Sequence, residues 1–181
     1  ASSVAYGGSP SYSLTYSGFV NNETTTSSTF TTGLTPPTCS AASYTTTTSV
    51  SASPLTISCS GGISTNYSFN TSATSNLTIS KARPTLNSWA NLPKNYGDPS
   101  FALEGPTTST PGTFTYGSSN SSIISLSAGT ATVVAVGTSV ITATFTPTDD
   151  GNFLSGETKT MTISVGQAQI TVTPDSNQSK V

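Results

Sequence analysis

The sequence contains no histidine, and only 7% of its 181 residues are charged. Without histidine the chain can form no Ser-His-Asp triad, no Cys-His pair and no histidine-based metal site. The seven acidic residues are spread along the chain, mostly in predicted turns, whereas a glycosidase needs two carboxylates about 5–9 Å apart in a cleft. We therefore expect no catalytic residues and no enzyme activity.

Basic residues and long apolar runs are also scarce. The five lysines and arginines occur singly and the net charge is −2, so no basic stripe exists to neutralise phosphates, and we expect no nucleic-acid partner. No apolar run approaches the roughly eighteen residues that span a bilayer, so we expect no membrane insertion in this segment. The chain starts without the basic and apolar stretches of a signal peptide, so we expect a mature segment of a longer protein.

Cys39 and Cys59 are the only cysteines. Two cysteines without histidine cannot complete a tetrahedral zinc site within this chain. They could be buried free thiols, but both lie in short Ser/Thr segments that resemble adjacent strands. In a chain of secreted character we predict a disulfide. It would close a loop of about twenty residues and stabilise the fold by about 3 kcal/mol.

What the sequence does contain is an internal repeat. The motif that begins at Tyr6, with the sequence Tyr-Gly-Gly-Ser-Pro, returns at Tyr96 as Tyr-Gly-Asp-Pro, ninety residues later. The strand-like run Leu77-Thr78-Ile79 matches Met161-Thr162-Ile163, 84 residues later. Landmarks in one order at nearly one spacing indicate a tandem array of modules.

Alternation of apolar with Ser and Thr residues predicts strands. It is clearest over residues 11–16, 138–145 and 158–165, and Gly, Asn and Pro turn residues separate such runs. No segment shows apolar residues at helical spacing, so we expect no long helix. The pattern predicts an all-β fold of two tandem Ig-like β-sandwich modules.

Each half of the sequence resembles a known family of bacterial repeats. The run Leu-Thr-Tyr-Ser-Gly-Phe-Val-Asn-Asn from Leu14 to Asn22, the paired cysteines and the strand at Leu77 are similar to the MBG family, mostly-β repeats of large bacterial surface proteins. Asn22 stands where that family usually has glycine. The runs 119–126 and 129–137 resemble the core of bacterial immunoglobulin-like domains. The resemblance implies extracellular, non-enzymatic modules.

These matches give the expected domain boundaries. Residues 1–81 form an MBG-like module and residues 82–167 an Ig-like module. The run that starts at Ala168 occupies the place of the run at Ala82, 86 residues earlier. We therefore expect residues 168–181 to be the opening strand of a following module, or a donor strand for a neighbouring copy.

Two groups of residues are candidate binding sites. Asp149, Asp150 and Asn152 offer oxygen ligands for Ca²⁺, although an ordinary polar turn demands the same residues. Trp89, Tyr96 and Phe101 could form an aromatic platform for a sugar. The alternative is that these aromatic side chains close the end of a sandwich core. We expect no other cofactor.

The function expected from these observations is mechanical. The chain would be a structural repeat segment of a secreted bacterial surface protein, a stalk, adhesin or fibre, located at the cell surface and extended as a stiff rod. Its partners would be neighbouring repeats or copies, and host or matrix glycans or proteins. The alternatives are a glycan-binding adhesive module and a filament subunit that assembles by strand exchange.

Overall fold

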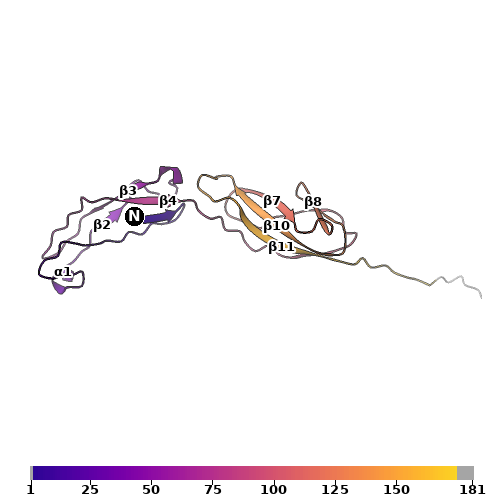
Figure 1. Ribbon diagram of the computed structural model, residues 1–181, viewed down its shortest axis with the longest axis horizontal. Helices are drawn as coiled ribbons and strands as arrows, with labels where there is room; N and C mark the ends of the chain where they lie inside the picture. Colours follow the sequence, from indigo (N-terminus) through magenta and orange to yellow (C-terminus); the bar gives the residue numbers. More distant parts are fainter. Residues whose placement is uncertain (1, 175–181) are drawn as a thin grey trace, which may run out of the picture. The chain divides into compact units, whose positions relative to one another are not determined.

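The computed structural model describes residues 2–174, and these form an all-β protein. Helix is confined to one turn each of α1 (Ser28–Thr31) and the 3₁₀ helix η1 (Val50–Ala52). The strands are β1 (Ser2–Ala5), β2 (Thr38–Ser40), β3 (Leu55–Ser60), β4 (Ser75–Ser80), β5 (Leu92–Asn95), β6 (Phe101–Ala102), β7 (Gly112–Ser118), β8 (Ile124–Ser127), β9 (Thr130–Val133), β10 (Gly137–Pro147) and β11 (Glu157–Gly166) (Figure 1). The predicted all-β class is confirmed.

The chain divides into two compact units. Unit 1 runs to Arg83 and also takes in Asp149–Leu154, and unit 2 comprises Pro84–Thr148 and the chain from Ser155 onward. From the sequence, residues 149–154 were expected in the second module. Backbone hydrogen bonds explain their place in unit 1, because Ala82 N–H donates to Asn152 O and Leu154 N–H donates to Ala82 O, both at 2.9 Å.

Unit 1 is built on one four-stranded sheet with the order β1-β4-β3-β2. The inward side chains of alternate strand positions, Val4, Ile57, Leu77 and Ile79, are buried together with Ala41. A second group of aromatic rings, Tyr16, Phe19, Phe30, Tyr67 and Phe69, packs mostly edge to face at centroid distances of 5.0–6.4 Å. Unit 1 thus combines an aliphatic sheet core with an aromatic cluster.

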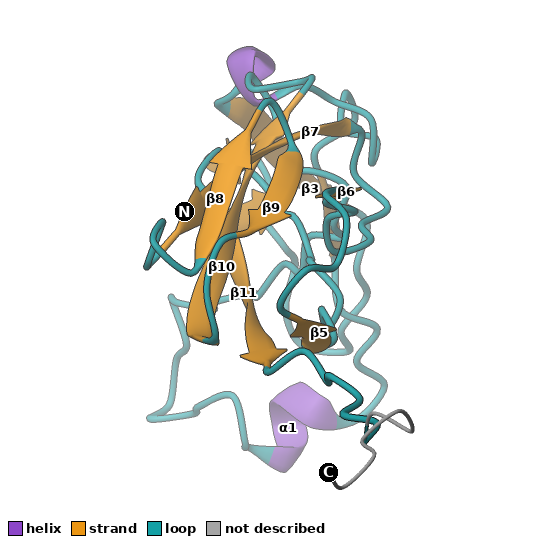
Figure 2. Ribbon diagram, turned by 90° about the vertical axis from the view of Figure 1, so that its right-hand side faces the viewer, coloured by secondary structure: helices purple, strands orange, loops and turns teal. Residues whose placement is uncertain are grey.

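Unit 2 has a four-stranded sheet in the order β5-β11-β10-β7 and a three-stranded sheet in the order β6-β9-β8. Figure 2 shows β8 and β9 side by side, with the long pair β10 and β11 next to them. Side chains from both sheets meet in one core: Leu103, Ile124 and Ala131 from the smaller sheet and its surroundings, Ile141, Met161, Ile163 and Val165 from the larger. Two packed sheets around a common core fit a β-sandwich.

The two units share the way in which their first and last strands pair. β1 lies parallel to β4, and β5 lies parallel to β11. Tyr6 N–H donates to Ser80 O and Tyr96 N–H donates to Gly166 O, both at 2.9 Å. The glycine after each tyrosine has positive φ, +80° at Gly7 and +92° at Gly97, which a non-glycine residue adopts only with strain. The Tyr-Gly motif is therefore a turn that fixes the start of each sheet.

The ladders also correct the alignment of the repeat. Ser2 and Leu92 each lie four residues before the motif tyrosine, and they pair with Leu77 and Ile163. The structural counterpart of Leu77 is therefore Ile163, 86 residues later, and not Met161. The error is two residues, which leaves every side chain on the same face of the strand, so the apolar pattern alone could not reveal it.

The strand predictions have different outcomes. β10 and β11 confirm the strands expected at 138–145 and 158–165. The strand expected at 11–16 is wrong: these residues form no ladder, although exposed and half-buried side chains alternate along them. Their counterpart in unit 2 pairs through Phe101 with β9, and the described part of unit 1 has no strand equivalent to β9. Residues 168–174 form no ladder either, and 175–181 lie outside the described residues.

Candidate functional site

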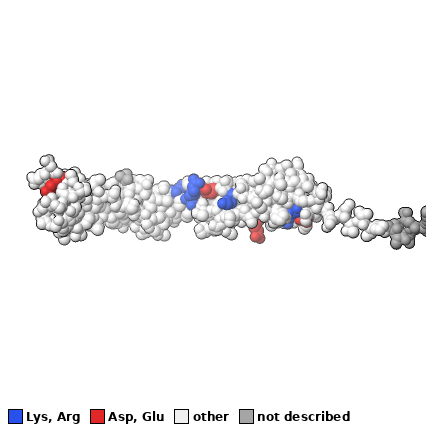
Figure 3. All heavy atoms as spheres, turned by 90° about the horizontal axis from the view of Figure 1, so that it is seen from below, with Lys and Arg blue, Asp and Glu red and all other residues white. Residues whose placement is uncertain are grey.

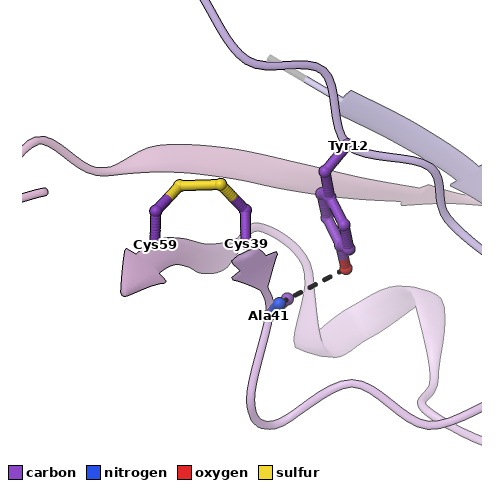
Figure 4. The surroundings of a disulfide bond; sticks show 4 residues. All are labelled: Tyr12, Cys39, Ala41 and Cys59. Carbon is purple, nitrogen blue, oxygen red and sulfur yellow. Dashed lines mark hydrogen bonds between the residues drawn. A yellow bond between two sulfur atoms is a disulfide. The ribbon is translucent and has the colours of Figure 1, made fainter. Parts of the chain in front are cut away.

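The predicted disulfide is present. Cys39 on β2 and Cys59 on β3 are directly opposite each other in the antiparallel ladder and are covalently joined. Beside the bond, the hydroxyl of Tyr12 accepts a hydrogen bond from Ala41 N–H at 3.3 Å, as Figure 4 shows. The disulfide thus fixes the short edge strand of unit 1 to the sheet, and Tyr12 connects the irregular segment 9–20 to the same place.

A groove lies next to the disulfide and is called the unit 1 groove below. Its volume is about 280 Å³. Its lining includes residues 12–16, Ile57, the disulfide, and residues 69–71 and 73–75. All of the lining residues are uncharged, and Leu14 is only half-buried. The groove is therefore suited to an uncharged ligand or segment with an apolar face.

In the predicted aromatic patch of unit 2, Trp89 and Phe101 come together. Both line a surface hollow of about 390 Å³ that also includes Leu103 and Met161. The indole Nε1–H of Trp89 donates to Glu104 O at 2.7 Å, and the ring packs 5.9 Å from that of Tyr116. The rings of Trp89 and Tyr116 also pack against the core of unit 2. Trp89 is therefore a partly buried ring that packs against the core of unit 2.

Tyr96, the third residue of the patch, does not line this hollow. Its side chain is 52% exposed, and its backbone N–H donates to Gly166 O. The cation near the patch is Lys94, whose Nζ lies 4.2 Å from the centroid of Phe101. The patch is thus a pair of partly buried rings with a lysine over one of them.

The candidate calcium ligands make hydrogen bonds within unit 1. Asn152 Oδ1 accepts from Val50 N–H at 2.8 Å and from Ser49 Oγ–H at 3.0 Å, and Asn152 Nδ2–H donates to Asp149 Oδ2 at 2.8 Å. Lys81 Nζ donates to the carbonyl oxygen of Asp150. One of the three predicted ligands, Asn152, therefore connects residues 149–154 to η1, which lies elsewhere in unit 1, and Asp149 holds its amide. The calcium site stays a prediction.

Charged side chains cover little of the molecule, as the face in Figure 3 shows. Glu23 accepts a hydrogen bond from the hydroxyl of Tyr67, and this bond, followed by desolvation, raises the pKa of Tyr67 above 10.0. Burial, and then the charge of Glu104, raises the pKa of Tyr116. Within residues 2–174, no three His, Cys, Asp or Glu side chains are grouped so that they could hold a metal ion. Glu23 and Glu104 thus each act on a neighbouring tyrosine hydroxyl.

The unit 1 groove was not predicted from the sequence. Tyr12, Leu14 and Tyr16 were identified as an apolar face, but Phe69 and Ile57, which complete the groove, were not. No signal in the sequence could have found it, because only the fold brings residues 12–16, Ile57 and Phe69 together.

Comparison with known proteins gives no match: no family model fits the chain, and a search of curated proteins finds no relative. The resemblance to MBG and bacterial Ig-like repeats therefore stays a prediction. No helix among residues 2–174 is long and apolar enough to cross a membrane.

Proposed function

We propose that this chain is a structural repeat segment of a secreted bacterial surface protein, a stalk, adhesin or fibre in which it acts as a mechanical spacer without catalysis. In this proposal both units are Ig-like β-sandwich modules of a tandem array, the first of them MBG-like. The repeated Tyr-Gly turn and the equal strand order of the two four-stranded sheets support a common origin in one repeating unit.

The observation that carries the proposal is the parallel pairing of the terminal strands in each unit. A pull on the two ends of unit 1 acts on the start of β1 and the end of β4, and these strands lie side by side and parallel. The pull draws them in opposite directions along their length, so their interstrand hydrogen bonds are loaded together and do not open one after another. β5 and β11 give unit 2 the same arrangement.

Composition and the disulfide support an exposed location. A disulfide persists in oxidising surroundings such as the cell surface. A chain with 7% charged residues depends little on surface ion pairs, which salt screens. The extracellular bacterial surface is therefore the location we propose, with neighbouring repeats or copies as partners.

Single-molecule stretching of the chain by its two ends tests the mechanical role. We expect two abrupt rupture events, one for each unit. Reduction of the disulfide lets the chain between Cys39 and Cys59, a sequence separation of 20, extend under load. The length released by unit 1 should then grow by roughly 65 Å, while the length released by unit 2 stays the same. A smooth extension without ruptures in the oxidised protein would refute the proposal.

A glycan-binding adhesive module is the second candidate. The observation that favours it is the hollow shared by Trp89 and Phe101, because sugars stack their apolar faces on aromatic rings. A glycan array probed with the native chain, Trp89→Ala and Tyr96→Ala separates the two candidates. Specific binding that is lost in Trp89→Ala and kept in Tyr96→Ala supports the adhesive role, and an array without signal refutes it.

A further inference from the structure

The four-stranded sheet of unit 2 has two edges, β5 and β7, and they differ in how they are protected. An exposed edge offers unpaired N–H and C=O groups to another strand, and proteins commonly block it with proline, lysine or a very short strand. β5 contains both Pro93 and Lys94 within four residues. At the place of β7 in the sheet of unit 1, β2 spans three residues and follows Pro36 and Pro37. The seven residues of β7 include no proline and no charged side chain.

The backbone hydrogen bonds show which residues of β7 are bonded to the sheet. Just beyond the two ends of the β7–β10 ladder, Thr148 N–H donates to Pro111 O and Ser119 N–H donates to Val140 O, both at 2.9 Å. In an antiparallel ladder only alternate residues bond to a given neighbour. The odd-numbered residues of β7 therefore bond to β10, and the even-numbered residues direct their N–H and C=O groups away from it.

The outward edge of β7 is open. Among residues 2–174, the N–H groups of Phe114 and Tyr116 have no hydrogen-bond partner. A hollow of about 440 Å³ lies beside them, lined by residues 114–116 and 126–129. The strands before and after β7 in the chain, β6 and β8, belong to the other sheet and do not pair with it. The strand order of unit 2 itself thus leaves this edge free.

We propose that β7 pairs with β7 of a second copy of the chain, antiparallel and about a two-fold axis at Thr115. Thr115 then lies opposite the partner's Thr115, and Phe114 lies opposite the partner's Tyr116. The even-numbered residues of the two strands exchange backbone hydrogen bonds, because their N–H and C=O groups already point outward. The two sheets become one continuous sheet across the axis.

The side chains of β7 favour a copy of the same strand as the partner. A two-fold contact places the residue on the axis opposite its own copy, so a charge there would meet a like charge. β7 carries no charge, and a Thr–Thr pair at the centre is a favourable cross-strand pair. The ring of Phe114 also meets that of a tyrosine, and aromatic pairs across strands stabilise a sheet. Because β7 extends three residues to either side of Thr115, each of its residues gains a partner.

Sedimentation of charge variants tests the contact. We expect the mass of the native chain to rise from 18.3 kDa toward twice that value as the concentration increases to about 1 mM. Thr115→Lys should keep the mass at 18.3 kDa, because two lysines would lie directly opposite each other. Thr113→Lys is the matched control on the same exposed face, opposite the partner's Gly117, and should still dimerise. A native chain that stays at 18.3 kDa, or equal masses of the two variants, would overturn the proposal.

A charge swap locates the axis. Thr115→Asp alone should also stay monomeric, whereas a mixture of Thr115→Lys and Thr115→Asp should dimerise, because opposite charges then meet across the axis. Thr115 is exposed, so both variants should keep the thermal transition of unit 2, which calorimetry checks. A folded mixture that stays monomeric where the native chain dimerises would overturn the proposal.

Amide hydrogen exchange identifies the edge that pairs. We expect exchange at Phe114 and Tyr116 to slow about tenfold once about nine-tenths of the chains are paired. Thr113 and Thr115, whose N–H groups bond to β10, should be protected at every concentration. Exchange at Phe114 and Tyr116 that does not depend on concentration would overturn the proposal. The inference goes beyond the spacer role, and its failure would leave the two rupture events expected on stretching untouched.

Discussion

Unit 1 and unit 2 use the same four-stranded sheet and cover it in different ways. In both units the first strand is parallel to the last, and the sheet orders β1-β4-β3-β2 and β5-β11-β10-β7 correspond strand for strand. Unit 2 closes its core with a second sheet, β6-β9-β8, and with Trp89. Unit 1 instead has the irregular segments around α1, the aromatic cluster and the disulfide. The shared sheet places the first and last strands of each unit side by side. The segments that pack on that sheet differ between the two units.

One position of the ladder illustrates the difference. Cys39 and Cys59 of unit 1 occupy the places of Tyr116 and Ala143 in unit 2. Unit 2 holds this pair of strands with a long ladder and with ring packing, because β10 pairs with β7 over seven residues. In unit 1 the corresponding ladder between β2 and β3 spans three residues, and a covalent bond lies at its centre. The disulfide therefore compensates for a short edge strand.

The largest expected effect comes from the core of unit 2. Phe145 is fully buried and packs 5.0 Å from Phe114. Phe145→Ala should reduce the free energy of unfolding of unit 2 by about 3–5 kcal/mol, through lost burial and the cavity that remains. Calorimetry should show the unit 2 transition moving down while that of unit 1 stays in place. A joint shift of both transitions would show that the units do not unfold separately.

Removal of the disulfide should destabilise unit 1 and leave the stability of unit 2 unchanged. Replacing Cys39 and Cys59 together by Ser opens the loop and should cost unit 1 about 3 kcal/mol. For a unit of this size that corresponds to a decrease in Tm of roughly 12–24 °C. The unit 2 transition serves as the internal control. An unchanged unit 1 transition would mean that the short β2–β3 ladder needs no covalent support.

A smaller effect on unit 1 is expected from the segment between β10 and β11. Asn152→Ala removes the acceptor of Val50 N–H and Ser49 Oγ–H and should destabilise unit 1 by about 1–2 kcal/mol. Asp150→Ala is the matched control, because Asp150 contacts Lys81 through its carbonyl oxygen, which the substitution keeps. Denaturant unfolding followed by Trp89 fluorescence reports unit 2, and tyrosine fluorescence adds unit 1. Equal effects of the two variants would contradict this role of Asn152.

The smallest expected effect is a difference in alkaline titration. Burial, and then the charge of Glu104, raises the pKa of Tyr116 above 10.0, so the folded state holds this proton more tightly than the unfolded chain does. The neutral hydroxyl therefore contributes to the stability of unit 2 below the unfolded pKa, and the contribution is lost as the pH rises through the folded pKa. Tyr116→Phe should remove this part of the pH dependence. Absorbance titration of tyrosinate checks it, and a Tyr116 that ionises below 10.0 would contradict it.

Short-range patterns in the sequence predicted two strands, β10 and β11, and the disulfide. Alternation located β10 and β11, where each strand lies in a long ladder with one buried face. The disulfide followed from two cysteines in strand-like segments. The same alternation at residues 11–16 predicted a strand that is absent, because a ladder also needs a partner and unit 1 has no described counterpart of β9.

The groove and its surroundings could not be predicted because they depend on contacts between distant residues. Tyr16, Phe30 and Phe69 join one aromatic cluster from three separate segments, and no periodicity connects them. The role of Asn152 depends on its pairing with Val50, about a hundred residues earlier in the chain. Turn chemistry alone made Asn152 a plausible calcium ligand, and only the fold shows the hydrogen bonds that its amide makes.

Amide hydrogen exchange at Tyr6 and Tyr96 tests the central claim, that the two units are copies of one sheet with parallel terminal strands. Their N–H groups donate to Ser80 O and Gly166 O at the same distance, so we expect strong protection of both amides in the native chain. Cys39→Ser with Cys59→Ser should lower the protection of Tyr6 and leave that of Tyr96 unchanged. Rapid exchange of either amide in the native, oxidised chain would show that the two units do not share this arrangement of terminal strands.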